Sequence, residues 1–247
     1  VEAYRVIRMK GEDFRRDDID MTEKEIDALL KEHFPPLAHV GIKGDCWMGC
    51  DTGYTSDPAE IRVWRETDKV RNILRVHMER VSYPIQARII AAMDRAYGFR
   101  SFGIDAGGNG KAVIQDLSGR DEYADLNDLE ERLVSIDFGG ATVIETRENG
   151  IEVKQATKEL MTALLNNAAR RQLGVWAKQD LEVEEQYASN SYVKNDRHVV
   201  YSKGHDHIID ADRCAWYARE WNRRLREIAG GFTEGEVVGP VEMSRRF

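Results

Sequence analysis

The segment CWMGCDTGY (46–54) places an acidic residue at the end of an apolar run. Such a run favours a buried strand, and the Thr52-Gly53 pair after Asp51 favours a turn. A second segment, RSFGIDAGGNG (100–110), repeats this pattern: a short apolar strand ends at Asp105 and a glycine-rich loop follows. Ligands of α/β proteins bind at the carboxyl ends of strands. Either aspartate alone is also compatible with a turn-capping role, but the two together point to a cation site.

A third acidic cluster lies in KGHDHIIDADRCAWYA (203–218), where Asp206, His207 and Asp210 precede or begin a predicted helix. Asp206 could simply cap that helix, and Asp210 could pair with Arg213 one turn later. The apolar residues between them anchor the helix to a core. Because buried carboxylates are costly unless they are paired or bind metal, we expect at least one residue of this cluster to be functional.

The rest of the chain alternates between strand-like and helix-like segments, which predicts an α/β fold with a mixed sheet and helices on its faces. Thr22 and Glu25 form a predicted capping box at the start of the first helix. The predicted helices span about 22–33, 83–98, 157–174 and 206–228, with 111–117 helix or loop. Further predicted strands are 61–67, 70–81, the hairpin 141–146 and 151–155, and two strands within 181–204 around a polar tip.

The composition is that of an ordinary globular protein, because 42% of the 247 residues are hydrophobic and 32% are charged. We find no apolar run long enough to span a membrane or serve as a signal peptide. The excess of 44 acidic over 36 basic residues gives a net charge of −8 and argues against a general polyanion-binding surface. The first residue is valine, so we expect a domain cut from a longer protein. The 3 cysteines, Cys46, Cys50 and Cys214, are expected to be buried free thiols.

Two nucleotide-binding motifs can be rejected at GIDAGGNGKAV (103–113). A phosphate-binding P-loop needs a glycine where Asp105 stands and a hydroxyl where Ala112 stands. A dinucleotide fingerprint starting at Gly108 meets Val113 in place of its last glycine. No Walker A motif occurs elsewhere, so an ATPase motor is not expected in this chain.

Taken together, MGCDTGYTSDPAEI (48–61), FGIDAGGNGKAVIQDL (102–117) and YSKGHDHIIDADRCA (201–215) resemble the nuclease domain of the large terminase subunit of tailed bacteriophages. The resemblance covers about residues 45–225 and implies a ribonuclease-H-like (RuvC-like) fold. It implies a nuclease domain at 41–230, a connector or arm at 1–40 and a C-terminal tail at 231–247. One departure is Cys214, where the family has an aromatic residue.

The resemblance also implies a ligand set. Asp51 and Asp105 match the family's first two acids, Asp57 matches a further acid six residues after the first, and His207 is the expected third ligand, with Asp210 close behind. Hard oxygen donors favour Mg²⁺ or Mn²⁺, and two such ions could activate water and stabilise the leaving oxygen of a phosphodiester. We expect Asp51 to bridge the ions, Asp105 to bind one and His207 with Asp210 the other. Asp57 and Asp206 are expected as alternate or supporting ligands.

Double-stranded DNA is the implied substrate, and a basic hairpin tip could contact its phosphates. This element carries Lys194, Arg197, His198 and Lys203, although an ordinary solvated hairpin would look the same. Phosphate contacts carry no sequence information, so little sequence preference is expected.

The implied function is a metal-dependent endonuclease that cuts concatemeric viral DNA during genome packaging in the cytoplasm of the infected bacterial host. Its implied partners are the terminase ATPase domain, the portal and the small terminase subunit, with no membrane, and the isolated domain is expected to be a monomer. A junction resolvase or ribonuclease H on the same fold remains an alternative. So does a catalytically weak DNA-gripping or docking module of the packaging motor.

Overall fold

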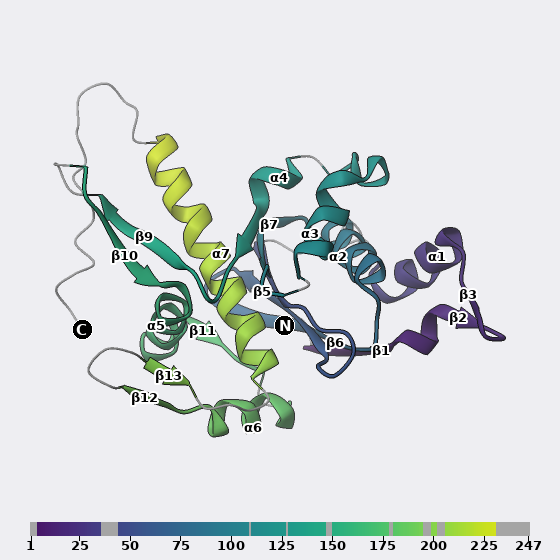
Figure 1. The fold of residues 1–247 in the computed structure, drawn as a ribbon, viewed down its shortest axis with the longest axis horizontal. Helices are drawn as coiled ribbons and strands as arrows, with labels where there is room; N and C mark the ends of the chain where they lie inside the picture. The colour runs from purple at the N-terminus through teal and green to yellow at the C-terminus, as the bar shows by residue number, and fades with distance from the viewer. Residues whose placement is uncertain are drawn as a thin grey trace.

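The computed structural model describes residues 4–35, 44–108, 110–126, 128–146, 150–177, 180–194, 199–201 and 206–230. Within these residues the chain forms a twisted central sheet with helices on both faces (Figure 1). None of the described helices is both long and apolar enough to cross a membrane.

The central sheet has the strand order β1-β6-β5-β4-β7-β8, and β11 also pairs with β6. The pairs β1–β6, β4–β7, β7–β8 and β11–β6 are parallel, whereas β4–β5 and β5–β6 are antiparallel. This is the mixed sheet that the sequence predicted. Its strands are β1 (Arg5–Lys10), β4 (Asp45–Asp51), β5 (Ala59–Glu66), β6 (Val70–Glu79), β7 (Phe99–Asp105), β8 (Leu133–Ile136) and β11 (Gly174–Val175).

Helices α1, α2 and α3 pack on one face of the sheet, and α5, α6 and α7 pack on the other. The helices are α1 (Glu23–His33), α2 (Tyr83–Tyr97), α3 (Gly110–Gly119), α4 (Leu129–Arg132), α5 (Thr157–Arg170), α6 (Leu181–Ser189) and α7 (His207–Gly230), with short 3-10 turns at Gly11–Phe14 and Asp121–Tyr123. Three small antiparallel hairpins are β2 (Arg15–Arg16) with β3 (Ile19–Asp20), β9 (Ala141–Thr146) with β10 (Glu152–Ala156), and β12 (Tyr192–Lys194) with β13 (Val199–Tyr201).

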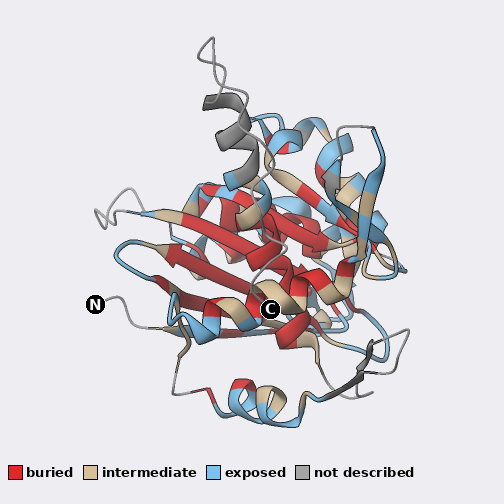
Figure 2. Ribbon diagram, turned by 90° about the vertical axis from the view of Figure 1, so that its left-hand side faces the viewer, coloured by how far each residue is buried: buried red, intermediate tan, exposed pale blue. Residues whose placement is uncertain are grey.

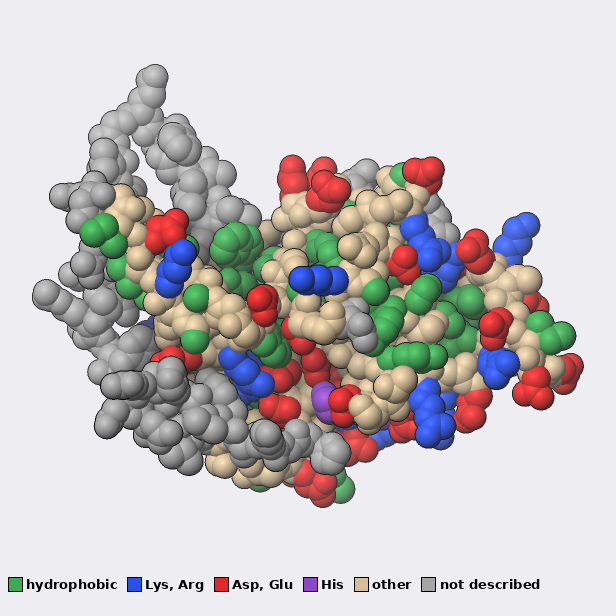
Figure 3. All heavy atoms as spheres, in the orientation of Figure 1, with side chains coloured by type: hydrophobic (Ala, Val, Ile, Leu, Met, Phe, Trp, Pro, Cys, Tyr) green, Lys and Arg blue, Asp and Glu red, His purple; other side chains and the backbone are tan. Residues whose placement is uncertain are grey.

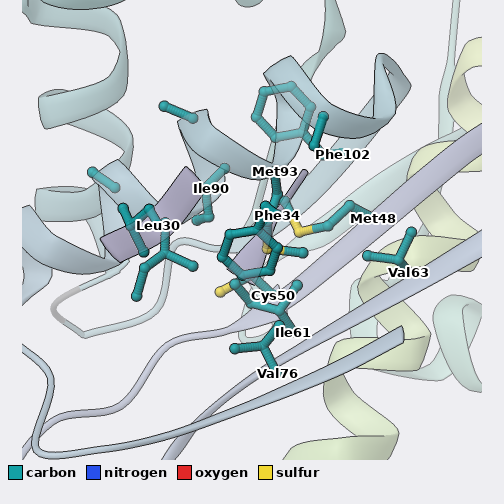
Figure 4. Close-up of a cluster of buried hydrophobic side chains, with 14 of the residues drawn as sticks. Leu30, Phe34, Met48, Cys50, Ile61, Val63, Val76, Ile90, Met93 and Phe102 are labelled. Atoms are coloured by element: carbon teal, nitrogen blue, oxygen red, sulfur yellow. The ribbon is translucent and has the colours of Figure 1, made fainter. Parts of the chain in front are cut away.

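Strand β4 is buried on both faces, and its side chains alternate between two cores. Cys46, Met48 and Cys50 belong to the large cluster that includes α1 and α2 (Figure 4). Trp47 belongs instead to the cluster beneath α7. The buried strands form the interior of the molecule (Figure 2). Asp51 therefore ends β4 on the face that α7 covers.

Residues of the predicted N-terminal arm pack on this same body. Strand β1 pairs in parallel with β6, and Phe14, Ile26, Leu30 and Phe34 join the large core cluster. Residues 36–43 and 231–247 lie outside the described residues, so the division at residues 40 and 230 stays a prediction.

The predicted helices and strands agree well with the structure. At the start of α1, the Glu25 carboxylate accepts hydrogen bonds from the backbone N–H and the hydroxyl of Thr22, both at 2.8 Å, as the capping box predicted. Gly98 ends α2 in the left-handed conformation with φ of 59°. All three cysteines are buried and free.

The strand predicted from residue 181 is wrong, because 181–189 form helix α6. The alternation of Leu181 and Val183 suggested a strand, but the Asp180 carboxylate accepts a hydrogen bond from the backbone N–H of Val183 and caps a helix there. The second half of that prediction is confirmed, since β12 and β13 pair as a hairpin.

Candidate metal centre

Asp51 and Asp105 end adjacent parallel strands. Cys50 of β4 pairs with Ile104 of β7, so the two aspartates follow paired positions at the same edge of the sheet. Asp51 is only 7% exposed, and Asp105 is partly buried. The structure thus brings these two predicted site residues together.

Two paired glycines allow α7 to lie directly against this edge. Gly49 pairs with Gly103 across β4 and β7. A Cβ atom at Gly49 would lie 2.0 Å from the carbonyl oxygen of Ala211, and one at Gly103 would lie 2.5 Å from that of Cys214. No side chain fits against α7 at these two positions, so there the helix backbone contacts the sheet.

The start of α7 brings His207 against the first aspartate. Its Nδ1 lies 2.8 Å from Oδ2 of Asp51, and its Nε2 lies 3.9 Å from Oδ1 of the exposed Asp57. Burial raises the pKa of the Asp51 carboxyl to about 7, against the lowering effect of the bond to His207. The bond to Asp51 in turn raises the pKa of His207.

Asp206 and Asp210 face two cations that sequence analysis did not find as site residues. Lys158 Nζ, from the first turn of α5, lies 2.9 Å from Oδ2 of Asp210 and 3.3 Å from Oδ2 of Asp206. Arg213, whose side chain is fully buried, forms a very short ion pair with Asp210. The alternative of an Asp210–Arg213 pair one helical turn apart is therefore realised, but in the interior rather than on the surface. Burial opposes the charge of Lys158, but Asp210 outweighs it and raises the pKa of this lysine.

Asp105 lies close enough to other carboxylates for their charges to affect its pKa. Its Oδ1 accepts a hydrogen bond of 2.8 Å from the backbone N–H of Gly107. Burial raises its pKa, the Gly107 N–H lowers it, and Asp210 raises it further. Asp137, which follows the parallel strand β8, adds a smaller raising effect. Sequence analysis missed Asp137, although its position directly after an apolar run repeats the pattern of Asp51 and Asp105.

The donor set fits a hard divalent cation. Carboxylate oxygens and one imidazole are ligands for Mg²⁺ and Mn²⁺, and the described carboxylates of this site outnumber the lysine and arginine that contact them. Figure 3 shows acidic side chains gathered in the middle of this face, with a histidine and basic side chains beside them. Among the described residues no three His, Cys, Asp or Glu side chains already form a closed ligand cluster.

The predicted DNA-contacting residues cannot be placed against this site. Arg197, His198 and Lys203 lie outside the described residues, and only the backbone of Lys194, at the end of β12, is described.

The strand order, the acidic residues at the ends of adjacent parallel strands and the helix that closes over them define an α/β protein of the ribonuclease-H-like class. A family model described as the Terminase RNaseH-like domain matches residues 48–218. The chain belongs to this family.

Solved structures with a similar fold include two phage proteins. The large terminase nuclease from thermophilic phage G20c with bound magnesium has a TM-score of 0.52 at 16% identity, covering 71% of this chain and 82% of that one. The Thermus phage P74-26 large terminase nuclease domain has a TM-score of 0.51 at 15% identity, covering 70% and 78%. At these identities the likeness establishes the fold. No curated protein matches the chain.

Proposed function

We propose that this chain is the nuclease domain of a phage large terminase, an endonuclease that uses Mg²⁺ or Mn²⁺ to cut concatemeric double-stranded DNA during genome packaging. The observation that carries the proposal is the meeting of Asp51, Asp105 and His207 from three distant parts of the chain at one buried, acidic edge. Family membership and the nuclease neighbours support it, and G20c neighbours contain bound magnesium and bound cobalt.

In this proposal Asp51, Asp105 and His207 hold the cations, with Asp57 and Asp206 as supporting ligands. When bound, divalent cations supply a nucleophile from water at neutral pH and stabilise the charge of the leaving oxygen. Asp51 orients the His207 ring through Nδ1, which leaves Nε2 directed toward Asp57. The Gly107 N–H fixes the carboxylate of Asp105. The close contact of α7 with Gly49 and Gly103 sets the spacing between these groups.

The structure favours a different role for Asp210 from the ligand role that its position in the sequence suggested. Both carboxylate oxygens of Asp210 already contact a cation: Oδ1 contacts Arg213, and Oδ2 contacts Lys158. We propose that Asp210 chiefly fixes the first turn of α7 to α5, and that it reaches a metal ion only when Lys158 moves.

The wider context is also proposed. Lys194, Arg197, His198 and Lys203 would contact DNA phosphates without reading sequence, so affinity should fall steeply as salt rises. The ATPase domain, the portal and the small terminase subunit would complete the motor, in the cytoplasm of the host cell. We propose a monomeric nuclease domain at 41–230, with 1–40 as a connector whose residues 4–35 pack on the sheet of that domain, and with 231–247 as a tail.

Incubation of supercoiled plasmid with Mn²⁺ tests the proposal. The wild-type protein should nick and linearise the plasmid, whereas Asp51→Asn should leave it intact. Lys154→Met, which changes an exposed residue of β10 paired with Glu152, serves as a control and should cut normally. Plasmid left intact by the folded wild-type protein would contradict the nuclease and favour the docking module. Selective cutting of branched DNA or of RNA–DNA hybrid would favour the resolvase or ribonuclease H.

A further inference from the structure

Lys158 is a cation inside the proposed metal centre. It lies one residue into α5, and its side chain is 24% exposed. The ammonium lies 5.3 Å from the centre of the Phe138 ring, which covers one side of it, while Asp206 and Asp210 accept from the other. These contacts hold the ammonium at the carboxylates instead of letting it extend into solvent.

The position of the ammonium is one that a divalent cation would also favour. It contacts one oxygen from each of two carboxylates that belong to different positions on the same helix end. Lysine carries a compact point charge, so it resembles a metal ion more closely than the planar arginine does. Arg213 differs in this respect, because it is fully buried and also donates to Asn190 at 3.3 Å, which fixes it as part of the framework.

The two sides of the centre therefore differ in how their charge is balanced. Asp51 and Asp105 have burial and His207 around them, and among the described residues neither forms an ion pair with a lysine or arginine. The charge of Lys158 also acts on Asp105 and lowers its pKa, but without direct contact. Asp206 and Asp210 have Lys158 and Arg213. A cation that enters the first side meets carboxylates that no lysine or arginine of the described residues contacts, whereas one that enters the second side must compete with an ammonium in direct contact with both carboxylates.

We propose that Lys158 is a positioning residue that acts as an internal counter-ion, occupying the Asp206–Asp210 side of the centre and having to be displaced before a divalent cation binds there. This rests on the proposed function, because it assumes that the acidic edge is a metal site. It implies that the site takes divalent cations in two steps of unequal affinity, with the weaker step set by Lys158.

Calorimetric titration with Mn²⁺ alone, without DNA, tests this proposal. Lys158→Met should strengthen the weaker Mn²⁺-binding step by about tenfold or more, since a like charge within a few ångströms of the entering ion is removed. Lys158→Arg keeps the charge and should bind Mn²⁺ like the wild type. Lys154→Met removes one lysine charge at an exposed position and should also leave the affinity unchanged.

The direction of the effect separates this role from a structural one. A lysine that merely supported the fold would lower Mn²⁺ affinity when replaced, so unchanged or weaker binding in a variant with a wild-type circular dichroism spectrum would overturn the proposal. If Lys158→Met does not fold, Lys158→Gln is used with the same criterion. A wild-type protein that binds Mn²⁺ and nicks plasmid, beside a Lys158 variant with unchanged binding, would remove this inference and leave the nuclease proposal standing. A wild-type protein that neither binds Mn²⁺ nor cuts DNA would overturn both.

Discussion

On the β5–β6 half of the sheet the charges buried beneath α7 are matched, whereas on the β4–β7 half the carboxylates are in excess. Asp212 of α7 is completely buried and accepts hydrogen bonds from Arg62, Trp64 and Tyr187 at 2.8–2.9 Å. Asp51, one strand away, is nearly as buried, but among the described residues its side chain pairs with a histidine alone, and its pKa is raised to about 7.

The matched half extends as a continuous network. Arg75 forms a bidentate pair with Glu60 at 2.7 and 3.0 Å and also contacts Asp180. The hydroxyl of Tyr4 donates to Asp180 and accepts from Arg62. The network thus joins the N-terminal segment, β5, β6, α6 and α7.

The difference separates the buried charges that serve the fold from those that we propose bind a ligand. A matched buried pair is costly to break, because the remaining charge has no partner. An excess of one sign is costly to keep, and we propose that here it marks a site whose partner comes from outside. Substitutions in the two halves should therefore have opposite effects on stability.

Asp212→Ala should have the largest effect on stability. It leaves the fully buried Arg62 without its carboxylate, and we expect a loss of about 3–5 kcal/mol in the free energy of unfolding. Urea denaturation followed by circular dichroism measures this. A loss below about 1 kcal/mol would mean that the buried network on the β5–β6 half does not stabilise the fold.

Gly49→Ala should disturb both halves, because the added Cβ would lie 2.0 Å from the Ala211 carbonyl oxygen and force α7 away from β4. Overpacking of this kind costs about 1–3 kcal/mol. Plasmid nicking should fall more sharply than stability, since His207 moves with the helix. Gly119→Ala is the matched control, because a Cβ there meets nothing within 4 Å.

Asp51→Asn should abolish nicking and yet stabilise the protein in EDTA at pH 8. The folded pKa of about 7 exceeds the unfolded value of about 4, so the folded chain binds a proton that the unfolded chain has lost, and stability falls as the pH rises through this range. The asparagine removes that penalty, which we expect to give a gain of about 1–3 kcal/mol at pH 8 and none at pH 4. Thermal unfolding of both proteins at the two pH values measures this gain. A variant that is less stable than the wild type at pH 8 would contradict the view that the Asp51 charge destabilises the fold.

His77→Gln should have the smallest effect. The hydrogen bond that His77 donates to the Glu60 carboxylate raises the pKa of His77, so the contribution of this histidine to stability is complete below about pH 6.5 and is lost as the pH rises through the folded pKa. We expect the wild-type protein to lose less than about 1 kcal/mol across this window and the variant to show a flatter pH profile. Identical profiles would indicate that Glu60 is already satisfied by Arg75.

The residues alone were sufficient to predict the two strand-end aspartates, whereas the meeting with His207 was implied by the resemblance to the terminase nuclease family. Asp51 and Asp105 each follow an apolar run, and hydrophobic burial forces such runs to be neighbours in one sheet. The apolar residues after His207 predicted that α7 packs on a core, and Ile208 and Ile209 are indeed buried.

The contact of Asp210 with Arg213, one helical turn away, could be predicted as a local pair, but the long-range ion pairs could not. Lys158 meets Asp206 and Asp210 across about 50 residues, and Arg62 meets Asp212 across 150. Such pairs leave no local periodicity in the sequence. The segment at 181–189 failed for a different reason, because the local cap at Asp180, which starts the helix, was outweighed by the strand-like pattern of the residues after it.

The paired glycines constrain the number of residues between each glycine and the aspartate that follows it. In both β4 and β7 a glycine stands two positions before the aspartate, so that the gap for the helix and the acid fall on the same side of each strand. Insertion or deletion of one residue between them would turn the carboxylate into the opposite core, among sulfur and aliphatic side chains. A distant relative could therefore change almost every other residue of these strands, and a search for such relatives should weigh the doubled Gly-x-Asp spacing above overall identity.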